Sequence, residues 1–156
     1  MARFHYKMQS ILDIKEKLET SAKQAFAEAN RRLEDEKEKL ENLYNRKEAY
    51  LEEGVSLRLE KLDMRKIREN KMAVMRMDEM IRTQKKAVDV AAKALEEARI
   101  KLQEVMKERK THEKLKENAF QEFLKEENAA ESKEIDQLTT YLHGQKLMGE
   151  KEDGKQ

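Results

Sequence analysis

Histidines and paired carboxylates are the residues of this chain that could do chemistry. His112 and Glu113 begin the zinc-binding pattern His-Glu-x-x-His, but Lys116 stands where the second histidine belongs. His5 and His143 are distant from His112 in sequence, and there is no cysteine to supply a thiolate. The many glutamates lack the shielded surroundings that turn a carboxylate into a catalytic acid or base. We therefore expect no catalytic residue, no metal site and no cofactor, and a protein that is not an enzyme.

A group of methionines could instead form a binding surface. Methionine fills uneven gaps in a core and also suits adaptable docking surfaces, so both roles stay open for this group. Residues 58–93 are also the basic part of the chain, with 11 basic against 6 acidic residues. This charge fits an ordinary solvated helix face or docking on an acidic partner. The group comprises Met64, Met72, Met75, Met77 and Met80.

The composition limits which elements can position these residues. The chain has 156 residues, of which 43% are charged and only 5% aromatic, and it has no proline. A single domain made of long exposed helices fits these values better than a globule with a thick core. The net charge of +1 argues against a general nucleic-acid binder. No apolar run is long enough to cross a bilayer, so we expect a cytoplasmic protein.

Apolar residues recur at alternating steps of three and four, which is the spacing of a coiled-coil seam. In the second half, the seam runs from Met64 to Leu138 and is clearest over Ile81, Gln84, Val88, Ala91, Leu95, Ala98, Leu102 and Val105. In the first half, a one-residue phase shift separates Phe4, Met8, Ile11, Leu18 and Ala25 from Leu33, Leu40, Leu43 and Tyr50. The pattern predicts an all-α fold in which two long helices form an antiparallel coiled-coil hairpin.

A helix stop signal predicts where the chain turns. Gly54 can close the first helix, Val55 can pack behind it, and Ser56 can cap the second helix. We expect helices at about 5–53 and 58–142, a turn at about 54–57, and a flexible tail over 143–156. The second helix would then extend beyond the first. Phe120, Phe123 and Leu124 would form an apolar surface that needs a partner.

Three segments of the chain resemble a known family. The first is Phe4-His-Tyr6-Lys-Met8-Gln-Ser-Ile11-Leu12-Asp-Ile-Lys-Glu16, the second is Gly54-Val-Ser56, and the third is His112-Glu-Lys-Leu-Lys116 followed by Glu131-Ser-Lys-Glu-Ile135-Asp136. In this order they are similar to FliJ, the small soluble component of the bacterial flagellar type III export apparatus.

The resemblance implies a monomeric hairpin similar to the central stalk of rotary ATPases. Such a protein inserts into the hexameric ring of the export ATPase, promotes ring assembly, contacts the export gate and handles export chaperones. It is associated with the inner face of the membrane only indirectly, and binds neither nucleic acid nor a small molecule. The positions that match the family's gate contact are Leu43, Tyr50, Met77, Met80 and Gln84. The ring contact would involve Phe4, Tyr6, Met8, Ile11, Phe120, Phe123, Leu124, Ile135 and Asp136.

Two other functions remain open from the sequence. The stalk of a virulence-type secretion system shares the expected architecture, and flanking genes would separate it from a flagellar protein. A prefoldin-like holding chaperone would require β-strands between the two helices, and no strand pattern surrounds Gly54.

Overall fold

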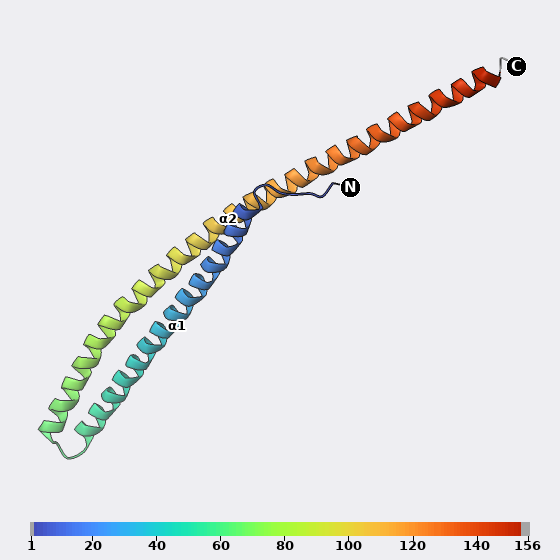
Figure 1. Ribbon diagram of the computed structural model, residues 1–156. Coiled ribbons are helices and arrows are strands. Elements are labelled where there is room, and N and C mark those ends of the chain that lie inside the picture. The colour runs from blue at the N-terminus through green and yellow to red at the C-terminus, as the bar shows by residue number, and fades with distance from the viewer. Residues whose placement is uncertain (1, 154–156) are drawn as a thin grey trace. The chain divides into compact units, whose positions relative to one another are not determined.

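The computed structural model describes residues 2–153 and contains two helices. Helix α1 spans Gln9–Leu59, helix α2 spans Met64–Asp153, and residues 60–63 connect them (Figure 1). No strand occurs in the described part of the chain. The predicted all-α fold of two long helices that pack against each other is confirmed.

The chain divides into two compact units. Residues 16–107 form the hairpin unit, which contains most of α1, the connection and the first half of α2. The described residues of 1–15 and 108–156 form the terminal unit. None of the helices in residues 2–153 has a segment long and apolar enough to span a membrane.

In the hairpin unit, the two helices meet along seams with a regular heptad spacing. The predicted second seam is confirmed over 81–105, because each of its positions is buried or half-buried. The seam of α1 passes without interruption through 19, 22, 26, 29, 33, 36, 40, 43, 47, 50, 54 and 57. This alternation of three and four residues keeps one stripe of each helix facing the other.

The predicted phase shift in the first helix is wrong. Leu18 is 45% exposed and Ala25 is also exposed, whereas Glu19 is only 7% exposed and Phe26 is half-buried. An unbroken heptad places Glu19 on the seam despite its charge, and its carboxylate lies 3.3 Å from the Lys23 ammonium. The sequence pattern favoured Leu18 because it is apolar, but a shift of the seam would interrupt the packing of every later position.

The turn also differs from the prediction at 54–57. Helix α1 continues through Gly54 and Ser56 to Leu59. Gly54 is buried, and a Cβ added to it would lie 2.6 Å from the Asn70 side-chain oxygen. The missing Cβ of Gly54 therefore leaves room for the Asn70 side chain of α2, and Gly54 does not end the helix.

The observed connection has its own stop and start signals. The Glu60 N–H donates to the Ser56 carbonyl in a last helical hydrogen bond of 3.2 Å. Asp63 then caps α2, because its carboxylate accepts from the backbone N–H of Arg65 at 3.1 Å and of Lys66 at 3.5 Å. Aspartate is a preferred N-cap residue, since it satisfies N–H groups that lack a partner within the helix.

Two amide side chains of α2 fix its register against α1. Asn70 donates to the Tyr50 carbonyl at 2.8 Å, and Gln84 donates to the Glu36 carbonyl at 3.0 Å and also to the Glu36 carboxylate. The two donors and the two acceptors are both 14 residues apart, which is two heptads on each helix. A slip of either helix would break both contacts together.

The predicted flexible tail is helical over residues 143–153, and its last residues, 154–156, lie outside the described part of the chain. Gly144 and Gly149 each cost a helix about 1 kcal/mol relative to alanine. Their neighbours are mostly Gln, Lys, Leu, Met and Glu, which favour helix. Gln145 also donates to the Tyr141 hydroxyl one turn away, at 2.8 Å.

Candidate partner-binding surfaces

An open groove in the hairpin unit brings together three of the five residues expected to contact an export gate. Leu43 of α1 and Met80 and Gln84 of α2 line this groove, which has a volume of about 480 Å³. Arg76 and Glu79 place one charge of each sign on its rim. The groove can therefore accept an apolar side chain that is flanked by polar groups.

The other two expected gate residues lie elsewhere in the same unit. Met77 is 5% exposed and belongs to the core between the helices, whereas Met80 is 45% exposed. Tyr50 is half-buried and lines a second, more polar hollow with Lys66, Glu69 and Arg76. Arg76 borders both hollows, and the sequence pattern missed it because a single arginine in a charged helix gives no signal.

The methionine group divides between one buried and four exposed positions. Met77 fills the core. Met64, Met72, Met75 and Met80 are between 45% and 64% exposed, so their thioethers are accessible to a partner. This division follows the seam, since only one of these five positions faces the centre of the helix interface.

In the terminal unit, three phenylalanines form an aromatic cluster. Phe4 precedes α1, and its ring centroid lies 5.1 Å from that of Phe120 at an interplanar angle of 67°, and 5.4 Å from that of Phe123. These distances and tilted geometries are favourable for aromatic pairs. The cluster packs Phe4 of the non-helical segment 2–8 against α2.

Other residues expected at the ATPase ring surround or follow this cluster. Tyr6 and Met8 line a hollow with Phe4, Ala119 and Phe123. Ile11 is half-buried on α1, and Leu124 is 37% exposed beside Phe123 in sequence. Ile135 and Asp136 lie further along α2, where residues 128–150 are all exposed. The structure therefore brings together Phe4, Tyr6, Met8, Phe120 and Phe123, whereas Ile135 and Asp136 lie apart on the exposed part of α2.

The exposed surface of α2 continues as an apolar stripe. Ile135, Leu138, Tyr141 and Leu142 recur at helical spacing and are between 55% and 62% exposed. Six acidic residues and two lysines occur over residues 122–136, a net charge of −4. An apolar stripe that follows an acidic segment suits a partner with apolar and basic groups.

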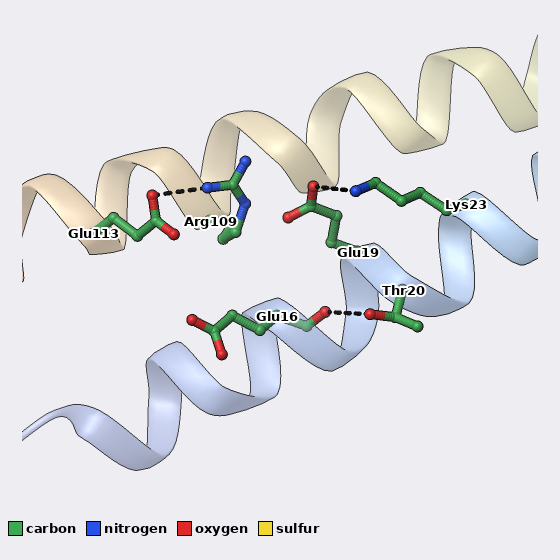
Figure 2. Close-up of polar contacts among 6 residues, drawn as sticks. All are labelled: Glu16, Glu19, Thr20, Lys23, Arg109 and Glu113. Atoms are coloured by element: carbon green, nitrogen blue, oxygen red, sulfur yellow. Dashed lines mark hydrogen bonds and ion pairs between the residues drawn. The ribbon is translucent and has the colours of Figure 1, made fainter.

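Ion pairs occur along each helix and between the two helices of the terminal unit. Figure 2 shows the Glu19–Lys23 pair on α1 and the Arg109–Glu113 pair of 2.7 Å on α2. In the terminal unit, Lys15 lies 2.8 Å from Glu108 and joins α1 to α2. The Lys15 hydrogen bond and charge, with a smaller contribution from His112, lower the pKa of the Glu108 carboxyl.

The histidine of the incomplete zinc pattern is half-buried in the terminal unit. The Nδ1 atom of His112 is buried without a hydrogen-bond partner. Across the described residues, no three His, Cys, Asp or Glu side chains are grouped so that they could hold a metal ion. Lys116 also lies on the same half-buried stripe as His112, so a cation would meet a like charge there.

Comparison with known proteins gives two matches. The sequence model of the family described as "Flagellar FliJ protein" matches residues 4–147. Among solved structures, the chain is similar to CT670 from Chlamydia trachomatis, which is described as a YscO homolog. The two are 26% identical with a TM-score of 0.71, and the match covers 90% of this chain and 96% of CT670. A search of curated proteins found no match.

Proposed function

Since this chain belongs to the flagellar FliJ protein family, we propose that it is a non-enzymatic stalk of the flagellar protein export apparatus. The observation that carries this proposal is the family match over residues 4–147, which includes both helices and both units. The stalk would insert into the hexameric ring of the export ATPase and promote assembly of that ring. It would also contact the export gate and handle export chaperones at the inner face of the cell membrane.

The terminal unit supports the proposed contact with the ATPase ring. The partly exposed Phe120 of its aromatic cluster and the exposed stripe from Ile135 to Leu142 provide apolar surface for such a contact. A stalk inside a ring needs exposed apolar surface, because only non-covalent contacts with the ring hold the stalk in place. The contact residues would be Phe4, Tyr6, Met8, Ile11, Phe120, Phe123, Leu124, Ile135 and Asp136.

Co-sedimentation with the flagellar export ATPase and a non-hydrolysable nucleotide tests this role. We expect rings to form more readily with the protein present and to carry about one copy each. Phe120→Ala/Phe123→Ala should weaken the effect, and Val90→Ser is a matched control because Val90 is an exposed residue of the hairpin unit. Unchanged ring formation, with the protein left in the supernatant as a helical monomer, would exclude the role.

The groove in the hairpin unit supports the proposed contact with the export gate. Leu43, Met80 and Gln84 line it, Tyr50 lies in the adjacent hollow, and Met77 supports the surface from the core. Met80→Ala should weaken gate binding without lowering the free energy of unfolding by more than about 0.5 kcal/mol, because this side chain is exposed. Met77→Ala should cost about 2–5 kcal/mol of stability, because it leaves a cavity in the core.

A pull-down with the cytoplasmic part of the gate distinguishes these two variants. The proposed contact predicts that Met80→Ala binds less tightly while its thermal unfolding matches that of the wild type. If Met80→Ala binds as tightly as the wild type, the gate surface lies elsewhere on the chain.

A virulence-type secretion stalk remains the second candidate. It is favoured by the similarity to the Chlamydia trachomatis protein described as a YscO homolog. The flanking genes decide between the two systems, since flagellar genes support the first candidate and injectisome genes support the second. The prefoldin-like alternative required strands between the helices, and residues 60–63 connect α1 to α2 without one.

A further inference from the structure

The connection between the helices carries bulky apolar side chains that point away from the core. Leu59 is 82% exposed, Leu62 66% and Met64 64%, so they protrude from the end of the hairpin. Leu57 and Ile67 on either side are half-buried and close the seam. We call Leu59, Leu62 and Met64 the hairpin tip. Exposure of three neighbouring apolar side chains to water is unfavourable, and burial of them against a partner would stabilise the complex.

Cations surround the hairpin tip. Residues 58–71 carry six basic side chains against three acidic ones, a net charge of +3. Two of the three acidic residues are already engaged, because Asp63 caps α2 and Glu69 lies 3.5 Å from the Arg65 guanidinium. All six basic residues are exposed. They are Arg58, Lys61, Arg65, Lys66, Arg68 and Lys71.

We propose that the hairpin tip inserts directly into an anionic membrane surface. Leu59, Leu62 and Met64 would enter the boundary between headgroups and acyl chains, while the surrounding cations contact lipid phosphates. Long basic side chains suit this role because their stems can lie along apolar surface while the charge stays in water. This inference does not depend on the proposed export function, because it uses only the exposure and charge of this segment.

Charge complementarity selects this end of the chain for lipid. The apolar stripe of Ile135, Leu138, Tyr141 and Leu142 is similarly exposed, but it follows a segment, residues 122–136, whose net charge of −4 would be repelled by an anionic surface. A protruding loop also fits a soft lipid surface, whereas an acidic protein would need a matching cavity. The family resemblance implied only an indirect association with the membrane. Insertion by a loop does not require a helix that is basic and apolar over its whole length.

Vesicle sedimentation with the full chain tests the proposal. We expect binding to vesicles that contain 30% phosphatidylglycerol and none to pure phosphatidylcholine, with the binding weakened by added salt. Leu59→Ser/Leu62→Ser should weaken the binding by at least about tenfold, because it removes the inserted groups. Lys61→Glu/Arg68→Glu should weaken it by more than about 25-fold, since each cation near an anionic surface contributes about fivefold.

Matched controls lie on the body of α2. Val90→Ser/Ile100→Ser removes two exposed apolar side chains, and Lys93→Glu/Lys101→Glu reverses two exposed charges. Both should bind phosphatidylglycerol vesicles as the wild type does. The helical circular dichroism signal of all four variants should match the wild type, because each substituted side chain is exposed.

A fluorescence measurement reports insertion directly. The chain has no tryptophan, so Leu62→Trp introduces a single probe at the hairpin tip and Val90→Trp provides the control. Phosphatidylglycerol vesicles should shift the emission of Leu62→Trp to the blue and brominated lipids should quench it, with no change for Val90→Trp. The proposal is overturned if the wild type does not bind these vesicles, even if it binds an acidic protein. Equal effects at Leu62 and Val90 would also overturn it.

Discussion

Gly54 shows how a single missing Cβ determines the approach of the two helices. The Asn70 amide occupies the space that a Cβ would take and donates to the Tyr50 carbonyl. In most exposed helices, replacing glycine by alanine stabilises by about 1 kcal/mol. Here the added methyl group must displace Asn70, so the intrinsic gain and the lost hydrogen bond oppose each other.

We expect Gly54→Ala to leave the free energy of unfolding nearly unchanged, because about 1 kcal/mol of helix propensity is offset by about 1 kcal/mol of lost hydrogen bonding. In an Asn70→Ala background, the same substitution should stabilise by about 1 kcal/mol, since no amide remains to be displaced. Urea unfolding of the four proteins measures this coupling. If the two substitutions are additive, Asn70 does not restrict the space at Gly54.

The Lys15–Glu108 pair predicts a pH dependence in the terminal unit. The folded-state pKa of Glu108 is lowered, first by its hydrogen bond from Lys15. The stability from this pair is therefore present above the ordinary carboxyl pKa, and it is lost as the pH falls through the lowered value. Glu108→Gln should lose stability relative to the wild type at neutral pH, and the difference should disappear in acid.

Thermal unfolding between pH 7 and pH 2 checks this expectation. Carboxyl NMR of the wild type should show Glu108 titrating below its ordinary range, and Lys15→Met should return it toward that range. A Glu108 titration that does not respond to Lys15→Met would exclude the contact as the cause.

At the scale of the elements, the N-terminus of α2 depends on Asp63. Its carboxylate accepts backbone N–H groups that have no partner within the helix. Asp63→Ala should lower the free energy of unfolding by about 1 kcal/mol, whereas Asp63→Ser should largely retain the cap. Urea unfolding with amide hydrogen exchange measures both, and the loss of protection should concentrate in the first turn of α2. Equal stability of the alanine and serine variants would show that the cap does not contribute.

How far the sequence predicts these elements depends on how apolar each seam is. The seam of α2 was predictable because its positions from Ile81 to Val105 are apolar except for Gln84. The seam of α1 was not predictable, because the charged Glu19 lies on the seam whereas the more apolar Leu18 and Ala25 are exposed. Periodicity identifies the correct stripe only where the buried residues are also the apolar ones.

The turn shows a second reason why local patterns fail. Glycine is the residue type that often ends a helix, but Gly54 instead makes room for the side chain of Asn70 on the other helix. Asn70 is 16 residues away in sequence, so a local sequence pattern around Gly54 does not reveal this contact. The same error hid the hairpin tip, because a turn at Gly54 would have placed Leu59 and Leu62 inside a helix. The sequence placed Phe4, Phe120 and Phe123 at the same end of the hairpin, but it left Phe120 and Phe123 beyond the paired region, whereas Phe4 of this chain packs on both.

At the scale of the whole molecule, two exposed apolar surfaces have charges of opposite sign. The hairpin tip lies in a segment of net charge +3, and the stripe on the C-terminal part of α2 follows a segment of net charge −4. These charges cancel in the composition, which is why a total of +1 conceals two different binding preferences. The two surfaces also belong to different compact units. A substitution in one unit should therefore leave the other surface intact.

We expect the two proposed activities to be separable by substitution. Phe120→Ala/Phe123→Ala should reduce ATPase ring assembly and leave binding to anionic vesicles unchanged, because it alters only the terminal unit. Leu59→Ser/Leu62→Ser should do the reverse, because both leucines are exposed and lie in the hairpin unit. Both assays are made on the same protein preparations, with circular dichroism to verify that the helices are intact. If either variant impairs both activities while its helix content is unchanged, ring and membrane use one shared surface, and the assignment of a partner to each unit is wrong.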